Sequence, residues 1–372
     1  MHHTFSLLEQ PLPRTSSAIV ATAPGKFELA TITIPDPGPG EVIVAIESCG
    51  VCHADLHFLD GDLGNDFPYV LGHEATGKIE AIGTGVTNVD VGDFVLLNWR
   101  AVCNECRNCR RGRQHLCLET KNANQPMTWD GQDLTPALGV GAFAEKTLVA
   151  AGQATKIDAD SASPALALLS CSAMAGIGAV LNAAQVNPGE SVAVIGCGGV
   201  GSAALLGAKL AGATTIIAAD TKQQKLTWAT ELGATHTIDT ADKTLSEAIH
   251  DITQDIGVDV VFDTVGNDQT YLEAFRSLDI AGTLVLLGTP PPGSEVTLPM
   301  RALSGRGCSL RTSWYGDCLP ERDFPTLAGL FHQGKLDLDG LVTETIPIDD
   351  VSTAIKKMRV GTTLRSVIVM SP

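Results

Sequence analysis

Apolar and polar residues alternate in short runs through the first half of the chain. Such runs lie within residues 28–48 and at 77–82 and 93–98, and prolines and glycines separate them. A period of two is typical of half-buried strands, and the breaks are typical of tight turns. The pattern therefore predicts an irregular, barrel-like module built of short strands.

The second half has a different pattern, because its strands are continuous apolar runs. Four runs are predicted to be strands: 191–195, 214–219, 258–262 and 282–287. Segments with helical spacing lie at 199–211 and 222–232. Strands that are apolar throughout are buried on both faces, so their alternation with helices indicates an α/β fold with a doubly wound parallel sheet.

Helical segments at 165–169 and 173–184 join the two modules, and the regular alternation ends at about residue 316. Leu364–Met370 is predicted to be a strand that returns to the first module. The glycines and valines near 282–288 would suit an edge strand through which copies of the chain associate. The expected partition is one domain of residues 1–172 and 316–372 and a second of residues 173–315.

Composition narrows the possible functions. Of 372 residues, 44% are hydrophobic and 18% are charged, which argues against disorder. The net charge of −17 argues against nucleic acid as a partner, because binding phosphates takes clustered Lys and Arg. No apolar stretch approaches the roughly 18 residues of a membrane span, and Met1–Thr4 does not resemble the start of a secretory signal. Ten cysteines then indicate a reducing compartment, so we expect a cytoplasmic protein with metal-binding thiols.

A phosphate-binding turn follows the first strand of the second module. The segment Gly196-Cys197-Gly198-Gly199-Val200-Gly201 fits G-x-G-x-x-G, and it begins a helix. Gly196 permits the turn, Gly198 lets the backbone approach a pyrophosphate, and Gly201 allows close helix packing. Asp220, which ends the next strand, would bind the ribose hydroxyls and repel a 2′-phosphate, which favours NAD over NADP. The alternative is a glycine turn that binds no nucleotide.

Four cysteines have the spacing of a structural zinc site. Cys103-x2-Cys106-x2-Cys109-x7-Cys117 places the four thiols within fifteen residues. Four thiolates complete a tetrahedral shell and leave no position for a substrate, so the ion would stabilise the loop at about 98–120. The alternatives are an iron–sulfur cluster, a redox pair of cysteines, or a zinc knuckle for nucleic acid, which the acidic chain disfavours.

A second set of metal ligands is dispersed along the chain. Cys52 lies in Gly-Val-Cys-His, His73 and Glu74 lie in Gly-His-Glu, and Cys171 lies at the junction of the modules. Two thiolates and one imidazole would leave one zinc position open for water or substrate, as in catalytic sites. The spacing alone does not decide this, because a lone cysteine such as Cys171 is more often a core residue.

In these motifs the chain resembles the zinc-containing medium-chain alcohol dehydrogenases. The Gly-Val-Cys-His and Gly-His-Glu motifs, the four cysteines, the glycine turn and the closing Leu364-Arg365-Ser366 occur in that family's order and spacing. The resemblance implies a Rossmann sheet plus a β-rich, GroES-like catalytic domain, and two zinc ions and one NAD per subunit. It also implies that Cys52, His73 and Cys171 bind a catalytic zinc, with Glu74 just behind it to tune or exchange with the ligands.

The same resemblance assigns residues to the coenzyme and to proton transfer. His53 and Arg365 would meet the pyrophosphate, Lys225 would bind the adenosine ribose, and His57 would accept the substrate proton. The backbone of Leu287-Gly288-Thr289 would approach the nicotinamide carboxamide. One departure is Ala54, where the family usually has Ser or Thr, so that water, Asp55 or the coenzyme ribose must connect the substrate to His57.

A narrower resemblance rests on segments 98–103, 141–146 and 313–318, which are similar to actinobacterial mycothiol-dependent formaldehyde dehydrogenases, also described as S-nitrosomycothiol reductases. It implies oxidation of S-(hydroxymethyl)mycothiol with NAD, or reduction of S-nitrosomycothiol with NADH. Independently of this resemblance, a homo-oligomer, either a dimer or a tetramer, is expected because homo-oligomers are the common case. Trp99, Arg100 and Trp314 are candidates for the lining of the substrate pocket. The alternatives are a primary or aryl alcohol dehydrogenase that needs no thiol, and a nucleotide-binding protein without catalysis.

Overall fold

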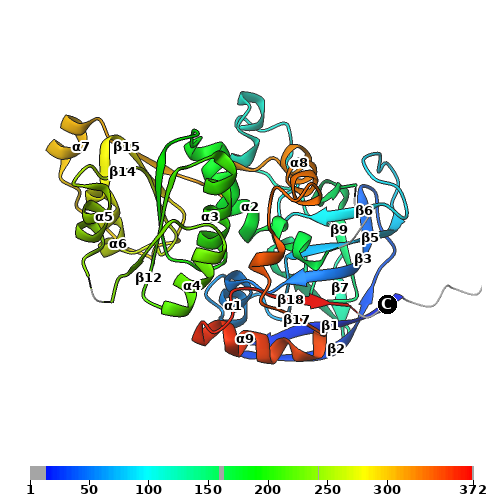
Figure 1. Ribbon diagram of the computed structural model, residues 1–372. Coiled ribbons are helices and arrows are strands. Elements are labelled where there is room, and N and C mark those ends of the chain that lie inside the picture. Colours follow the sequence, from blue (N-terminus) through cyan, green and yellow to red (C-terminus); the bar gives the residue numbers. More distant parts are fainter. Residues whose placement is uncertain (1–13, 159–162, 242, 371–372) are drawn as a thin grey trace, which may run out of the picture.

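The computed structural model describes residues 14–158, 163–241 and 243–370, which form three β-sheets and the helices packed on them (Figure 1). The parallel sheet has the strand order β13-β12-β11-β14-β15-β16. Its strands are β11 (Ser191–Ile195), β12 (Thr215–Asp220), β13 (His236–Asp239), β14 (Val258–Asp263), β15 (Leu278–Leu286) and β16 (Ser309–Thr312). The strand order reverses between β11 and β14, and a crevice for ligands opens at the carboxyl ends of strands at such a point.

Helices cover both faces of this sheet, as the apolar character of its strands requires. They are α3 (Gly199–Ala211), α4 (Gln223–Glu231), α5 (Leu245–Thr253), α6 (Asp268–Arg276) and α7 (Met300–Arg306). Two apolar cores result, one on each face, and Val194 and Ile195 of the same strand belong to different cores. The predicted α/β architecture is therefore confirmed.

The β-rich part consists of a closed barrel and a seven-stranded sheet. The barrel contains β1 (Arg14–Ala23), β2 (Lys26–Ile34), β4 (Tyr69–Val70), β7 (Met127–Trp129) and β8 (Gln132–Pro136). The sheet contains β3 (Glu41–Gly50), β5 (Glu74–Ile82), β6 (Phe94–Leu97), β9 (Lys146–Ala150), β10 (Ala154–Lys156), β17 (Glu344–Ile346) and β18 (Ser366–Val369). As predicted, the C-terminal strand β18 returns to this sheet, where Val367 pairs with Gly50 of β3.

The remaining helices are α1 (His53–Asp60), α8 (Pro320–His332), α9 (Val351–Val360) and a broken helical segment between the two parts of the molecule. That segment comprises the 3-10 helix η5 (Pro164–Ser170), α2 (Ser172–Gly178) and the π-helical η6 (Ala179–Ala184). In the described part of the chain no single helix is long and apolar enough to cross a membrane; η5 with α2 and η6 pass that test together, with a bend of 63°.

The prediction of an edge strand near 282–288 was wrong. The run near 282–288 lies in β15, which pairs with β14 on one side and β16 on the other, so it is an interior strand. The edge on this side of the sheet is β16, whose four residues are all exposed. Its sequence Ser-Leu-Arg-Thr gives no apolar signal, and therefore the pattern of hydrophobic residues did not predict it.

Candidate active site

The start of α1 holds the first predicted metal ligand in place. Cys52 directly precedes the helix, and Asp55, in its first turn, accepts a hydrogen bond from the Cys52 amide at 2.9 Å. The other carboxylate oxygen accepts from the Gly72 amide at 3.0 Å and lies 3.1 Å from Nδ1 of His73. Asp55 is fully buried. One carboxylate thus orients both ligands, and a proton on Nδ1 leaves Nε2 of His73 free to bind a metal.

The structure brings Cys52, His73, Glu74 and Cys171 together, and we call this group the open cluster. One potential ligand atom of each residue lies within 4.8 Å of the others. Nε2 of His73 is buried and has no hydrogen-bond partner among the described residues. A buried polar atom without a partner is costly, and a metal ion in the cluster would satisfy it. The hydrogen bond from Cys171 holds the pKa of the Cys52 thiol well below its usual range despite burial, which favours the thiolate that zinc requires.

Glu74 lies behind the cluster in a buried ion pair. Arg365 donates to one of its carboxylate oxygens, and the Ser172 amide donates to the other at 2.9 Å. Burial raises the pKa of Glu74 to about 7, although the guanidinium of Arg365 opposes this shift. Because both oxygens already have partners, Glu74 is placed to steady the neighbouring ligands as much as to bind an ion itself.

The four cysteines of the loop form a separate, closed group, here called the four-cysteine lobe. Their sulfurs are 3.5 Å apart for Cys106 and Cys109, 3.5 Å for Cys103 and Cys117, and 3.9 Å for Cys103 and Cys109. Tetrahedral zinc with Zn–S bonds of about 2.3 Å requires sulfurs about 3.8 Å apart. All ten cysteines are free thiols. The geometry therefore fits a structural zinc ion.

A cavity of about 920 Å³ opens at the point where the strand order reverses. The glycine turn, Asp220 and Lys225 line it from the parallel sheet, and His53 lines it from α1. A Cβ added at Gly198 would meet no atom within 4 Å, so this residue faces open space, whereas one added at Gly201 would collide with the Gly196 carbonyl. Gly198 thus leaves space for a pyrophosphate, and Gly201 allows the close packing of α3.

The predicted coenzyme residues do not all line this cavity, and Asp220 and Lys225, which do, are also paired with each other or with the backbone. Asp220 accepts hydrogen bonds from the amides of Cys197 and Lys222, and Nζ of Lys225 lies 3.6 Å from it. Arg365 does not line the cavity. Its guanidinium packs against the glycine turn, because a Cβ added at Gly199 would come within 2.8 Å of it. The segment Leu287-Gly288-Thr289 does not line the cavity either; its first two amides donate to the Asp263 carbonyl.

His57 stands apart from the open cluster. Its Nδ1 lies 3.0 Å from the Asp62 carboxylate, and its side chain is 54% exposed. Asp55 is engaged with Cys52, Gly72 and His73, so it does not provide the connection to His57 that Ala54 lacks. The sequence had suggested Asp55 only as a possible proton bridge, and its role in orienting the two ligands was missed; an acidic residue three positions after the cysteine that precedes a helix was the available signal.

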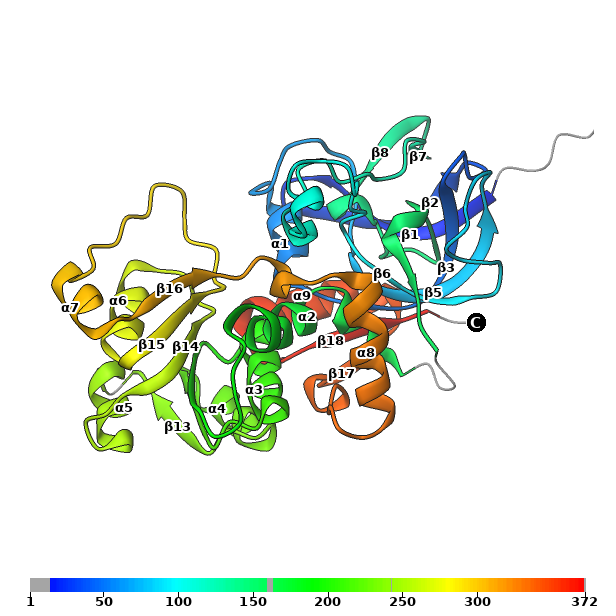
Figure 2. The same cartoon turned by 90° about the horizontal axis from the view of Figure 1, so that it is seen from above.

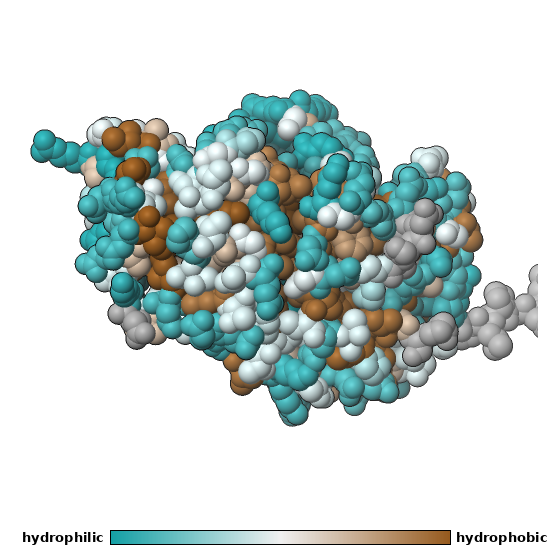
Figure 3. Space-filling model, viewed as in Figure 1, coloured by the Kyte–Doolittle hydropathy of each residue, from teal (hydrophilic) through white to brown (hydrophobic). Residues whose placement is uncertain are grey.

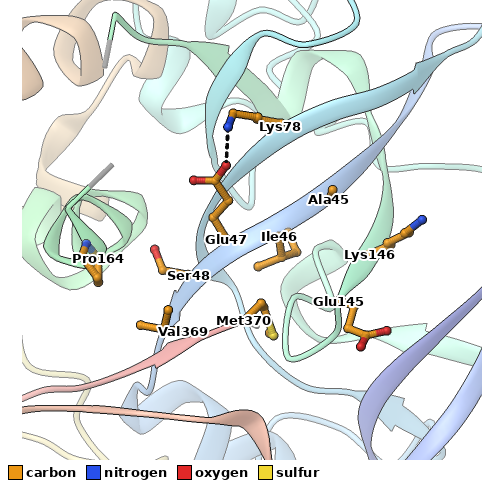
Figure 4. Close-up of a pocket in the computed structure, with 10 residues that line it drawn as sticks. All are labelled: Ala45, Ile46, Glu47, Ser48, Lys78, Glu145, Lys146, Pro164, Val369 and Met370. Carbon is orange, nitrogen blue, oxygen red and sulfur yellow. Dashed lines mark ion pairs between the residues drawn. The ribbon is translucent and has the colours of Figure 1, made fainter. Parts of the chain in front are cut away.

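A second cavity, of about 570 Å³, lies on the β-rich part (Figure 4). Lys78 and Glu47 form an ion pair at its edge, 2.9 Å apart, and Val369 and Met370 line it from the C-terminal strand. None of its lining residues belongs to either cysteine cluster or to the glycine turn. This second cavity therefore contains none of the predicted metal ligands or glycine-turn residues.

Comparison with known proteins agrees with this geometry. Residues 38–159 match the alcohol dehydrogenase GroES-like domain, and residues 199–333 match the zinc-binding dehydrogenase family. The chain is 36% identical to S-(hydroxymethyl)glutathione dehydrogenase of Escherichia coli O1:K1 / APEC, over 95% of this chain and 99% of that protein.

Two solved structures are similar over nearly the whole chain. Benzyl alcohol dehydrogenase from Acinetobacter calcoaceticus is 32% identical with a TM-score of 0.90, covering 96% of this chain and 100% of that one. A zinc-binding dehydrogenase from Sinorhizobium meliloti 1021, bound to NADP, is 26% identical with a TM-score of 0.82, covering 96% and 99%.

Proposed function

Because the chain belongs to the zinc-binding medium-chain alcohol dehydrogenase family, we propose that it oxidises the hydroxymethyl adduct of formaldehyde and a small thiol, with mycothiol as the thiol and NAD as the acceptor. The observation that supports this most is that the open cluster lies beside the cavity at the glycine turn, because His53, which directly follows Cys52, lines that cavity. The relative that acts on S-(hydroxymethyl)glutathione supports a thiol adduct. The segments 98–103, 141–146 and 313–318 support mycothiol in particular.

The chain's own residues would divide the work as follows. When bound, zinc would promote loss of the hydroxyl proton as a Lewis acid, and NAD would accept the hydride. Cys52, His73 and Cys171 would hold the metal, with Asp55 fixing the orientation of His73. The proton would pass by water or the coenzyme ribose to His57, since Ala54 has no hydroxyl. Its exposed imidazole, beside Asp62, suits release of the proton to solvent.

The pocket for the thiol would be bordered by aromatic side chains. The rings of Trp99 and Trp314 are 6.0 Å apart, and the Arg100 guanidinium lies 5.2 Å from the Trp99 ring. Trp314 is 54% exposed and Nε1 of Trp99 has no partner among the described residues. Nε1 of Trp99 is buried, and the Arg100 guanidinium donates to the His115 and Cys117 carbonyls, so the exposed ring of Trp314 is the part of this group that would contact the polar, sugar-like tail of the thiol.

The assay for this proposal follows NADH formation with formaldehyde in the presence of mycothiol, of glutathione, or of no thiol. We expect turnover with mycothiol only. Equal rates with glutathione would contradict the choice of thiol. Turnover of formaldehyde hydrate or octanol without any thiol would contradict the adduct as substrate, while leaving the zinc and NAD chemistry intact.

An aryl alcohol is the second candidate substrate. The structural similarity to benzyl alcohol dehydrogenase and the aromatic group around Trp99 favour it. Benzyl alcohol belongs in the same assay, and thiol-independent oxidation of it would establish this alternative.

Asp220 predicts the preference between NAD and NADP. Replacing Asp220 with asparagine removes the negative charge while keeping an acceptor for the Cys197 amide. We expect kcat/KM for NAD to fall by about thirtyfold, since charged hydrogen bonds of about 2 kcal/mol are lost, and kcat/KM for NADP to rise. Steady-state kinetics with both coenzymes measure this. An unchanged ratio of the two values would show that Asp220 does not contact the ribose.

We further propose that the protein is a homo-oligomer that associates through β16. The four residues of this strand are exposed, and Ile280, Met300 and Leu310 add exposed apolar area on β15, α7 and β16. Figure 3 shows hydrophobic surface on the side of the molecule that carries α7 and β15. An open sheet edge with apolar neighbours is a natural site for pairing with a second copy.

A further inference from the structure

Cys171 lies at the break between two helical segments. It follows η5 and precedes α2, its φ and ψ are −149° and −82°, and the axes on its two sides differ in direction by 63°. Its amide donates to the Leu168 carbonyl of η5 at 3.3 Å, and its carbonyl accepts from the Ala175 amide of α2 at 2.8 Å. Because one hydrogen bond leads into each segment, the direction of its side chain depends on how the two segments are held at the adjoining residues, Ser170 and Ser172.

Both neighbours are buried and held by other parts of the chain. The Ser172 amide donates to Glu74, and Arg365 donates to the Ser172 hydroxyl. On the other side, the Ser170 hydroxyl donates to the Ala75 carbonyl at 3.2 Å, and the Ser170 carbonyl accepts from the Tyr315 hydroxyl at 2.5 Å. That carbonyl ends η5, where helical partners are lacking. Tyr315 is thus a link from outside the cluster to the peptide that precedes Cys171.

Tyr315 reaches this carbonyl from an unusual turn. Residues Tyr315, Gly316 and Asp317 have φ values of 57°, 66° and 49°, so three successive residues are left-handed, and only one is glycine. Such a conformation costs free energy and persists where surrounding contacts fix it. The turn lies in the segment that crosses from β16 to α8 (Figure 2).

Several contacts fix the turn against the helices that follow Cys171. Asn182 of η6 donates to the Gly316 carbonyl at 3.0 Å, and a side chain at Gly316 would collide with the Met174 carbonyl of α2. The Tyr315 ring packs edge-on against Trp99 at 5.1 Å. The turn therefore holds the Tyr315 hydroxyl at a fixed position relative to α2.

We propose that Tyr315 is a positioning residue for the open cluster: its hydroxyl fixes the Ser170 carbonyl and so directs the Cys171 sulfur toward Cys52 and His73. This inference rests on the proposed role of Cys171 as a metal ligand. A purely structural role, in which the hydroxyl only satisfies a buried carbonyl, would affect stability without affecting the metal.

The test compares zinc release from the holoenzyme carrying Tyr315→Phe with release from the unchanged enzyme. A chromogenic chelator measures the rate for each of the two ions, and Cys106→Ser identifies the phase of the four-cysteine lobe. We expect the open cluster to release its ion about tenfold faster, the low end for partners that orient metal ligands, and the lobe to release its ion at an unchanged rate. Acceleration of both rates by the same factor, or of neither, would overturn the proposal.

Tyr271→Phe is the matched control, because the Tyr271 hydroxyl also donates to a backbone carbonyl, that of Gly288, at 3.1 Å. It should leave both release rates unchanged. In enzyme with Co²⁺ in the open cluster, Tyr315→Phe should shift the visible absorption bands and Tyr271→Phe should not. If Tyr315→Phe does not fold, Asn182→Ala frees the turn instead and should accelerate release from the open cluster alone; unchanged rates would overturn the proposal.

The variant Cys171→Ser tests whether Cys171 binds the metal, separately from the positioning role of Tyr315. If that variant retains two zinc ions with unchanged release rates, Cys171 is not a ligand and the proposed site fails. If it loses the ion of the open cluster while Tyr315→Phe behaves as the unchanged enzyme, only the positioning role fails.

Discussion

Replacing Cys171 with serine is expected to lower kcat by at least about a thousandfold, because the metal contributes several kcal/mol to stabilising charge in the transition state and each 1.36 kcal/mol is tenfold in rate. The serine hydroxyl is a poor zinc ligand, and the other ligands cannot move closer, since Asp55 fixes His73 and the start of α1 fixes Cys52. Stopped-flow or steady-state measurement of NADH formation, together with the zinc content per chain, tests this expectation.

Cys308→Ser provides the control, because Cys308 is also half-buried but lies beside the edge of the parallel sheet, where its sulfur faces the Asp279 carbonyl. This variant should keep its rate and both zinc ions. If Cys171→Ser retained more than a tenth of the activity, the open cluster would not be the reaction centre.

Features encoded within a few residues could be predicted from the sequence. The strand, glycine turn and helix at 191–211 lie where the apolar pattern placed them, because each depends on local spacing. The four-cysteine lobe is equally local, since all its sulfurs come from one loop. Cys52, His73 and Cys171 are far apart in the chain, and it was the family's motif order, not their spacing, that indicated a shared site.

What the sequence did not predict depends on contacts between distant segments. Asp55 is an ordinary acidic residue at the start of a helix until the fold brings Gly72 and His73 to its carboxylate. Tyr315 reaches Ser170 across 145 positions, and its left-handed conformation has no residue signature apart from Gly316. The edge strand β16 is polar and short, so its place in the sheet follows from the pairing of β15 and not from its own composition.

Arg365 contacts both the open cluster and the glycine turn of the coenzyme site. The strand β18 pairs with β3, and Arg365, directly before β18, lies beside Glu74, where it also donates to the Val51 carbonyl at 3.0 Å. The same guanidinium lies against Gly199 of the coenzyme turn. Burial alone would lower the pKa of Arg365, but the charges of Glu74 and Cys52 raise it, so the guanidinium stays charged.

Arg365→Met is therefore expected to lower the free energy of unfolding by about 3–5 kcal/mol, because it leaves Glu74 buried without its counter-charge. Urea unfolding measures this loss. The double variant with Glu74→Gln should recover most of the stability, since no unpaired charge remains and the glutamine oxygen still accepts from Ser172. If the double variant were as unstable as Arg365→Met, lost packing and not the charge would be the cause.

The loss in Arg365→Met should also depend on pH. The pKa of Glu74 is already raised from 4.5 to about 7 in the folded protein, and removing Arg365 raises it further. A folded state that binds a proton more tightly than the unfolded state loses stability as pH rises from the unfolded pKa to the folded one. The variant should thus be most stable near the lower end of that interval and weakest above about pH 7, whereas the double variant should show a flatter profile. A deficit that stayed constant from below pH 7 to above it would exclude Glu74 as its source.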